Sequence, residues 1–145
     1  MYDAILVPVD GSECALQALD RAVDLAATYD ATLHVVTVAD VRITFGGSEF
    51  DFDAAHVLEY AEQRGEHVID EALDRLDDLD TDLPTESAVV TGIPDEEILS
   101  YAEDNGIDVI VMGTHGRSGL DRVLLGSVTE RVIRRSPVPV LTVRT

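Results

Sequence analysis

The chain has 145 residues, 46% of them apolar, and it carries 29 acidic residues, ten arginines and no lysine. This length is enough to bury a sheet on both faces, and we expect residues 1–145 to form a single domain. The net charge of −19 argues against binding to nucleic acid or to an anionic membrane, because both are polyanions.

The sequence contains no run of about 18 apolar residues, the length that a membrane-spanning helix needs. Its first residues have the character of a strand rather than of a signal peptide, so we expect a cytoplasmic protein. The single cysteine, Cys14, excludes a disulfide within the chain and a zinc site built from cysteines. We interpret it as a small packed residue, and we expect no metal site made of protein ligands.

The first predicted elements are a buried strand over residues 3–9 and an amphipathic helix. The helix is indicated by alanine and leucine residues that recur at helical spacing from Ala15 to Ala26, and its small residues allow close packing on a sheet. Asp10 follows the strand at its carboxyl end, the side on which open α/β sheets bind ligands. From the residues alone, Asp10 either contacts a ligand or caps the helix.

A second strand is expected over residues 32–38, and we interpret His34 within it as a hydrogen-bonded core residue rather than a metal ligand. Residues 39–52 have no helical period and contain two adjacent glycines. A connection of this length is usually a functional flap or a mobile loop. From residue 53 to about 78, apolar residues at helical spacing among many acids predict a long helix with one solvated side.

The remaining elements continue the same alternation of strand and helix. Residues 87–90 form a third strand, and Pro94 stands in the first turn of a third helix, where its missing N–H costs little. Strands are expected at 108–112 and 138–143. Because parallel strands need crossover helices, this pattern predicts an α/β doubly wound sheet.

Glycines are concentrated after the fourth strand, at Gly113, Gly116 and Gly119, and a further break comes at Gly126. Apolar residues then return at helical spacing. We expect Ser127 to be the N-cap of this helix, with Glu130 completing a capping box. A strand, a glycine-rich loop and a helix N-terminus together bind anions, because unpaired amides and the helix dipole point to the same place.

The charge distribution favours the same end of the chain. Residues 113–145 hold six arginines and two acids, a balance of +4, whereas residues 1–112 hold four arginines and 27 acids, a balance of −23. A polyanion therefore has one favourable place to approach. The alternative is that the glycines only form a tight turn and the arginines coat an exposed helix.

At these residues the chain resembles the ATP-binding branch of the universal stress protein family. The pattern Gly113-x2-Gly116-x9-Gly126-Ser127 is similar to the glycine pattern of that branch, and the resemblance extends from Tyr2 to Arg144. It implies a Rossmann-like fold with five parallel strands in the order 3-2-1-4-5 and a nucleotide at their carboxyl ends.

The resemblance further implies an ATP-binding regulatory module in the stress response, with Mg²⁺ carried on the phosphates rather than on protein ligands. It also implies a homodimer in which residues 138–143 pair antiparallel with their twin across a two-fold axis. The implied ATP contacts are Pro8, Val9 and Asp10 at the nucleoside, Val38 at the adenine, Met112 and Gly113 at the ribose and base, and Gly116, Gly126, Ser127, Val128 and Thr129 at the phosphates.

Two other functions remain open at this point. One is an enzyme that hydrolyses ATP slowly, with His115 and Asp121 as acid–base groups, although a Walker motif needs a lysine that this chain lacks. The other is a flavodoxin-like FMN carrier. That carrier would need a phosphate loop after the first strand and aromatic walls for the flavin, whereas this chain has no tryptophan.

The acidic residues are spread along the helices rather than gathered in a tail, so they charge the whole surface with one sign. Such a surface repels itself in dilute salt and is tolerated when the Debye length falls to about 3 Å near 1 M. We interpret the composition as an adaptation to a halophilic, very salty cytoplasm.

We therefore predict that the melting temperature climbs steadily as KCl rises from tens of millimolar to molar concentration, because the salt screens the repulsion among the acids. Thermal unfolding followed by circular dichroism across a KCl series measures it. A melting temperature that stays flat across the series would show that the acids are compensated within the fold.

Overall fold

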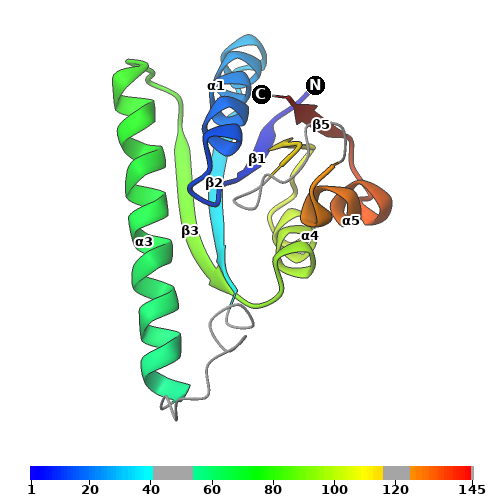
Figure 1. The fold of residues 1–145 in the computed structure, drawn as a ribbon. Coiled ribbons are helices and arrows are strands. Elements are labelled where there is room, and N and C mark those ends of the chain that lie inside the picture. Colours follow the sequence, from blue (N-terminus) through cyan, green and yellow to red (C-terminus); the bar gives the residue numbers. More distant parts are fainter. Residues whose placement is uncertain (41–53, 116–124, 145) are drawn as a thin grey trace.

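The computed structural model describes residues 1–40, 54–115 and 125–144, and strands and helices alternate along them (Figure 1). Its elements are β1 (Ala4–Pro8), α1 (Glu13–Tyr29), β2 (Thr32–Ala39), α3 (Ala54–Asp78), β3 (Thr85–Thr91), α4 (Pro94–Asp104), β4 (Val109–Gly113), α5 (Ser127–Arg135) and β5 (Val140–Val143). The strands pair in parallel in the order β3-β2-β1-β4-β5. This confirms the doubly wound five-stranded sheet and its strand order.

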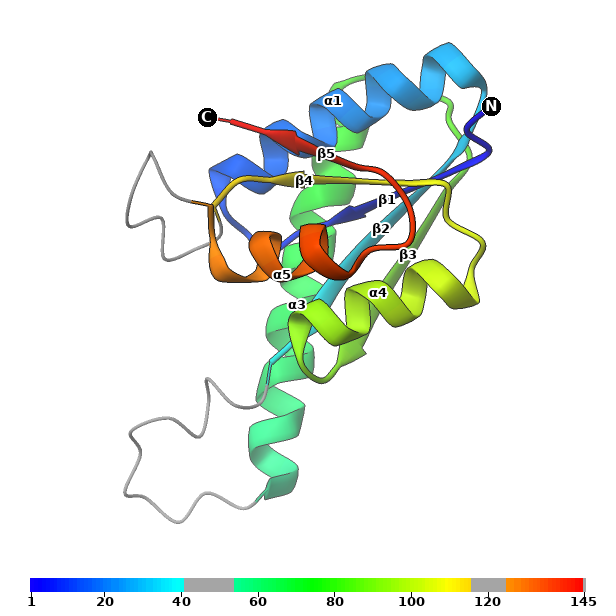
Figure 2. The same ribbon diagram turned by 90° about the vertical axis from the view of Figure 1, so that its right-hand side faces the viewer.

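Helices cover both faces of the sheet, α1 and α3 on one side and α4 and α5 on the other (Figures 1 and 2). Successive strand residues point to opposite faces, so Ile5 and Val7 pack with α1 and α3 whereas Leu6 packs with α4 and α5. Both faces of β1 are therefore apolar, which explains why the strand has a continuous apolar run instead of an alternating one.

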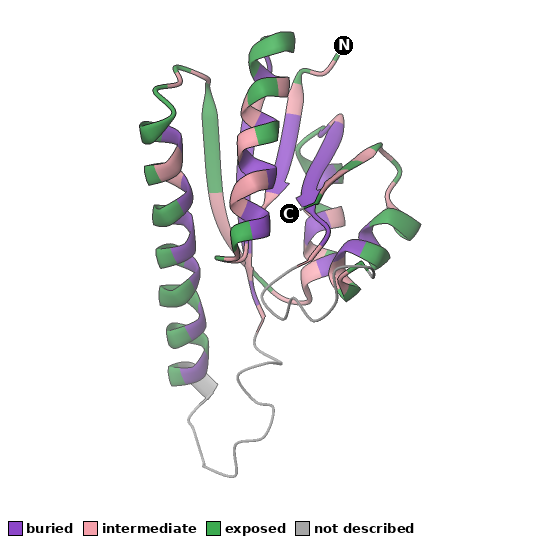
Figure 3. Ribbon diagram, turned by 45° about the horizontal axis from the view of Figure 1, so that its top comes forward, coloured by how far each residue is buried: buried purple, intermediate pink, exposed green. Residues whose placement is uncertain are grey.

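Burial is greatest at the centre of the sheet and falls toward its edges (Figure 3). All five residues of β4 are buried, whereas most of β3, at one edge, is exposed or half-buried. Helix α3 buries one stripe, including Val68 and Ala72, and turns its acids to solvent. Arg75 of α3 joins it to α1 by donating to both carboxylate oxygens of Asp20, at 2.9 and 2.5 Å.

The N-cap of α1 is Ser12, whose hydroxyl accepts from the Ala15 N–H at 3.2 Å. Asp10 does not cap the helix, and instead its carboxylate accepts from the Ser12 N–H at 3.0 Å. The capping alternative for Asp10 is therefore wrong. Two residues of turn separate it from the helix, and this spacing keeps Asp10 at the end of β1.

The capping box predicted at the start of α5 is also wrong. The helix begins at Ser127 and its N-cap is Gly126, with no side-chain capping bond. The Gly126 carbonyl accepts from the Glu130 N–H at 2.9 Å, so helical bonding starts one residue earlier than predicted. The Glu130 carboxylate lies 2.8 Å from the Arg134 guanidinium, one turn further on, and does not turn back to the helix start.

His34 is a buried and hydrogen-bonded residue of β2. Its Nδ1 lies 2.8 Å from the hydroxyl of Tyr101 on α4, and its Nε2 lies 3.4 Å from the Glu86 carboxylate on β3. Burial lowers the pKa of His34, an effect that the charge of Glu86 partly opposes. The side chain therefore joins α4 to the sheet.

Several predicted features lie outside the described residues: most of the connection at 39–52, and Gly116, Gly119 and Asp121. The last strand was expected at 138–143 and begins at Val140 instead. Pro139 lies just before it, and its carbonyl accepts from the Ile110 N–H at 3.0 Å. In the described part of the chain, no helix is long and apolar enough to cross a membrane.

Gly65 sets how closely α3 approaches the sheet. A β-carbon built on it would lie 2.6 Å from Cγ1 of Val89 on β3, too close for two carbon atoms. Gly65→Ala should therefore lower the free energy of unfolding by about 1–3 kcal/mol through overpacking, although alanine is the better helix former. Urea denaturation of the two proteins measures the difference.

The matched control is the double variant Gly65→Ala with Val89→Ala, in which the methyl groups that meet the new β-carbon are gone. It should recover stability relative to the sum of the two single changes, because the two sites are in contact. Strict additivity of the two effects would contradict the packing explanation.

Candidate functional site

A cavity of about 600 Å³ opens at the carboxyl ends of the strands, between α3 on one side and α4 and α5 on the other. Of the eleven residues predicted for the site, ten line it and Gly116 lies outside the described residues. Those ten are Pro8, Val9, Asp10, Val38, Met112, Gly113, Gly126, Ser127, Val128 and Thr129. Segments more than a hundred residues apart in sequence thus meet at one edge of the sheet.

The end of β1 forms one wall of the cavity. The Val9 N–H donates to the Val36 carbonyl at 2.8 Å, which continues the pairing of β1 with β2 just past the strand. Asp10 follows, held by the bond that its carboxylate accepts from the Ser12 N–H. Because Ser12 in turn caps α1, the turn that positions Asp10 is fixed at both ends.

Gly113 closes β4 where α1 begins. A β-carbon on Gly113 would lie 2.6 Å from the Cys14 sulfur and 3.0 Å from the Cys14 carbonyl oxygen. The glycine is therefore needed for close packing between β4 and α1. Cys14 is buried at this contact, where its thiol also donates to the Val143 carbonyl at 3.5 Å.

Two hydrogen bonds fasten the start of α5 to the end of β4. The Gly126 N–H donates to the Thr114 carbonyl at 2.6 Å, and the Thr129 hydroxyl donates to the Gly113 carbonyl at 2.8 Å. The N–H of Gly126 and the hydroxyl of Thr129 are thus used by the fold itself. Gly126 and Thr129 therefore have fewer donors left for a phosphate than the resemblance implied.

The first turn of α5 keeps three backbone donors for the cavity. Within the described chain, the N–H groups of Ser127, Val128 and Thr129 have no hydrogen-bond acceptor. The first internal hydrogen bond of the helix is donated by the Glu130 N–H. A helix start leaves these groups unpaired as a matter of geometry. Together with the helix dipole they make a positive site at the cavity wall.

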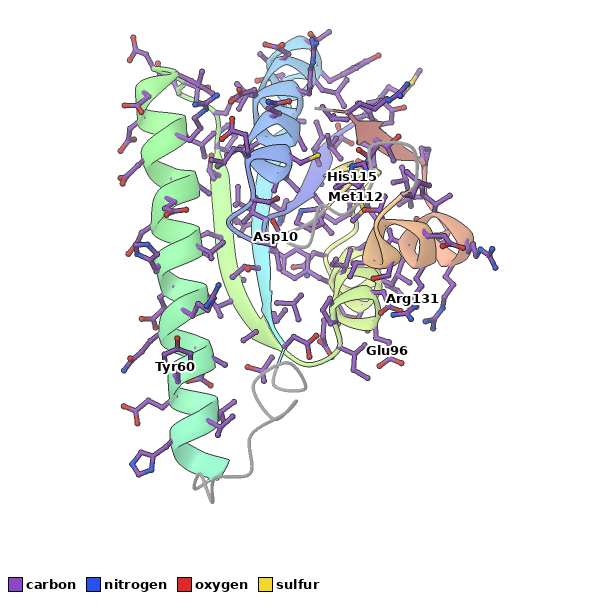
Figure 4. The ribbon with its side chains drawn as sticks, viewed as in Figure 1. Asp10, Tyr60, Glu96, Met112, His115 and Arg131 are labelled. Carbon is purple, nitrogen blue, oxygen red and sulfur yellow. The ribbon has the colours of Figure 1, made fainter. Side chains whose placement is uncertain are left out.

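Side chains that the sequence did not single out also line the cavity, among them Tyr60 and Arg64 from α3 and Arg131 from α5 (Figure 4). The sequence could have predicted Arg131 as a cavity residue, since it lies four residues after Ser127 and therefore on the same helix face. No sequence pattern predicts Arg64, because its position depends on how α3 lies across the sheet. His115 is at the wall too, with Nδ1 3.1 Å from the Thr114 hydroxyl and a buried Nε2 that has no hydrogen-bond partner among the described residues.

The cavity is chemically asymmetric. Its β1 and β2 side presents the carboxylates Asp10 and Asp40 with the apolar Val38, and the opposite side presents the amides of α5 with Arg131. The first side suits a flat group bearing hydroxyl or amine donors, and the second suits an anion. Among the described residues, no group of three histidines, cysteines or carboxylates is arranged to hold a metal ion.

Comparison with known proteins gives a consistent result over nearly the whole chain. A model of the universal stress protein family matches residues 1–144. Universal stress protein MJ0531 of Methanocaldococcus jannaschii is 35% identical over 144 residues, which are 99% of this chain and 83% of that protein.

Solved structures agree. Universal stress protein UspA from Lactobacillus plantarum superposes with a TM-score of 0.85 at 29% identity and covers 99% of this chain and 98% of its own. A universal stress protein solved in complex with cAMP is 32% identical, with a TM-score of 0.74 and coverage of 99% of this chain and 98% of its own.

Proposed function

The chain belongs to the universal stress protein family, and from this membership we propose that its cavity binds ATP and that the protein is a regulatory module of the stress response. The observation that supports this most directly is the first turn of α5, with three N–H groups at the cavity wall that have no acceptor among the described residues. Fixed amides at a helix N-terminus bind phosphate without further charge.

The rest of the cavity is consistent with the nucleoside of ATP. Its volume of about 600 Å³ falls in the usual range for small-molecule sites. In this proposal Pro8, Val9 and Asp10 border the nucleoside, Val38 lies beside the adenine, and Met112 and Gly113 flank the ribose and base. The neighbour solved with cAMP carries an adenine nucleotide in the same fold, which supports the choice of base.

Phosphate contacts in the proposal come from the backbone of Ser127, Val128 and Thr129, with Gly116 and Gly126 shaping the approach. Mg²⁺ would be carried by the phosphates and by water. This ion takes oxygen ligands and keeps several waters, so it needs no protein cage.

Slow hydrolysis of ATP is a second candidate, supported by His115. Its Nε2 is buried at the cavity wall with no partner among the described residues, and an imidazole there is placed to exchange a proton with a ligand or a water. Such activity would appear as release of inorganic phosphate. The fixed amides of α5 account for binding without it.

Ser127 provides the sharpest test of the proposed phosphate site. Ser127→Pro removes one N–H from the cavity, yet proline is well tolerated as the first residue of a helix, and the extended backbone of Gly126 (φ −61°, ψ 153°) suits a following proline. ATP affinity, measured by calorimetry, should fall about tenfold, the value of one charge-assisted hydrogen bond.

Ser127→Ala is the matched control, because it removes the hydroxyl and keeps the N–H. It should retain most of the ATP affinity while circular dichroism shows both variants folded. Equal ATP affinity in the proline and alanine variants would mean that the amide does not contact phosphate.

We also propose that the protein forms a homodimer through β5. This strand pairs only with β4 among the described strands and so leaves one edge open, with Leu141 45% exposed and Val140 half-buried. An exposed apolar edge invites pairing with another strand. Two copies related by a two-fold axis would each offer the same edge, which makes a closed and self-complementary contact.

Leu141→Asp should yield monomers or aggregates, because a charge would then lie in the apolar contact. Sedimentation in molar KCl should show twice 15.7 kDa for the unaltered protein. Leu79→Asp is the control, since Leu79 is similarly exposed (41%) just past the end of α3 and far from β5 in the fold. A 15.7 kDa species for the unaltered protein would end the dimer proposal.

The composition adds a proposal about where the protein works. A net charge of −19 without lysine suits a cytoplasm rich in salt, where the acids are screened. Screening also weakens long-range repulsion between this surface and an incoming nucleotide. Short contacts within the cavity then decide binding.

A further inference from the structure

A buried carboxylate stands behind one wall of the cavity. Asp95 lies in the first turn of α4 and is only 3% exposed, although an ionised carboxylate is costly to bury. Two arginines of α5 approach it. Arg135 donates to Oδ2 at 3.2 Å, and the nearest Arg131 nitrogen lies 3.9 Å from Oδ1.

The two arginines are held unequally. The Arg135 contact is a hydrogen bond, whereas 3.9 Å is within ion-pair range and too long for one. Oδ1 has no hydrogen-bond partner in the described structure. Asp95 therefore has one bonded cation and a second that attracts it without being fixed to it.

Only Arg131 of this pair lines the cavity. It lies one helical turn after Ser127 on the same face, and side chains on a helix lean toward its N-terminus. The Cα–Cβ bond of Arg131 therefore leans toward the first turn of α5, whereas its guanidinium lies near Asp95 and its side chain is 55% exposed. Figure 4 shows Arg131 below α5, near Glu96 at the start of α4.

Resting on the proposed function, we infer that Arg131 makes the site prefer ATP to AMP. Its guanidinium is shared between Asp95 and the outer phosphates of the nucleotide, which ATP has and AMP lacks. In this inference the amides at the start of α5 bind a phosphate that AMP and ATP both possess. Additional phosphates carry additional charge, and Arg131 is the α5 side chain that lines the cavity next to those amides and carries a positive charge. Guanidinium groups bind phosphate oxygens in pairs, which suits this task.

Arg131 can turn to a ligand without leaving Asp95 uncompensated. Arg135 keeps its hydrogen bond to Oδ2, and the N-terminal end of the α4 dipole also favours the carboxylate. Removing a partner from a buried charge is costly only when nothing else balances it. Asp95 thus acts as a positioning residue that holds Arg131 at the wall until phosphate is present.

The test compares ATP with AMP by calorimetry, each with the same Mg²⁺ in molar KCl, where long-range charge effects are screened. The unaltered protein should prefer ATP. In Arg131→Gln this preference should shrink about tenfold, with AMP affinity unchanged, because one charge-assisted contact to the outer phosphates is lost. Arg134→Gln is the matched control, since Arg134 lies on the same helix, pairs with Glu130 and does not line the cavity.

If Arg131 is shared between Asp95 and phosphate, a change at a residue outside the cavity should also alter the preference for ATP. A simple effect of charge inside the cavity does not predict this. Arg135→Gln should also reduce the ATP preference, although Arg135 does not line the cavity, because Arg131 is then the remaining cation for the buried carboxylate. Adding Asp95→Asn to Arg135→Gln should restore the preference. Arg135→Gln that leaves the preference unchanged would overturn the sharing.

The outcomes separate the inference from the function on which it rests. If the unaltered protein binds neither ATP nor AMP, the proposed function fails and the selectivity fails with it. If it binds ATP and Arg131→Gln has the same ratio of ATP to AMP affinity as Arg134→Gln, the role of Arg131 is overturned while ATP binding stands.

Discussion

The junction between the end of β4 and the start of α5 decides what the cavity can bind. Two bonds, from Gly126 to the Thr114 carbonyl and from the Thr129 hydroxyl to the Gly113 carbonyl, fix the helix to the sheet. These bonds occupy two donors that could otherwise bind a ligand, and they place the next three residues of the helix at the cavity wall. Close packing of Gly113 on Cys14 fixes the same strand end from the other side. A rigid frame on both sides makes the positive site available before any ligand arrives, which reduces the ordering cost of binding.

Charged groups are distributed unevenly around this junction. The chain is strongly acidic, yet α5 carries Arg131 near its middle, Arg134 and Arg135 in its last turn, and three amides at its start that have no acceptor among the described residues. The arginines in the last turn complement the negative end of the helix dipole, so they support the fold while they offset the negative surface. Arg134 and Arg135 are occupied by Glu130 and Asp95 respectively. An anion is thus attracted to a small region, and short contacts rather than the overall field determine whether it stays.

The fold was predictable from the sequence because each element carried its own period and its own ends. The apolar runs at β1 and β4 and the helical spacing in α1 and α3 set the alternation, while the strand order came from the resemblance. Helix ends were harder, since Ser127 and Gly126 both suit an N-cap and the tie from Gly126 to Thr114 selects between them. Residues such as Arg64 and Asp95 carry no local signal. Their positions depend on the packing of α3 and α5, which sequence spacing along a single helix does not report.

The donors of the site also bear on the proposed function. Backbone amides that the fold has already fixed can contact a phosphate without rearrangement, so they lower the free energy of the bound ligand. A phosphoryl-transfer enzyme adds a lysine or a fixed metal that stabilises the charge developing in the transition state. This chain has no lysine, and its described residues form no metal-holding cluster. In the proposed role as a nucleotide-binding module, these amides would serve to retain the nucleotide.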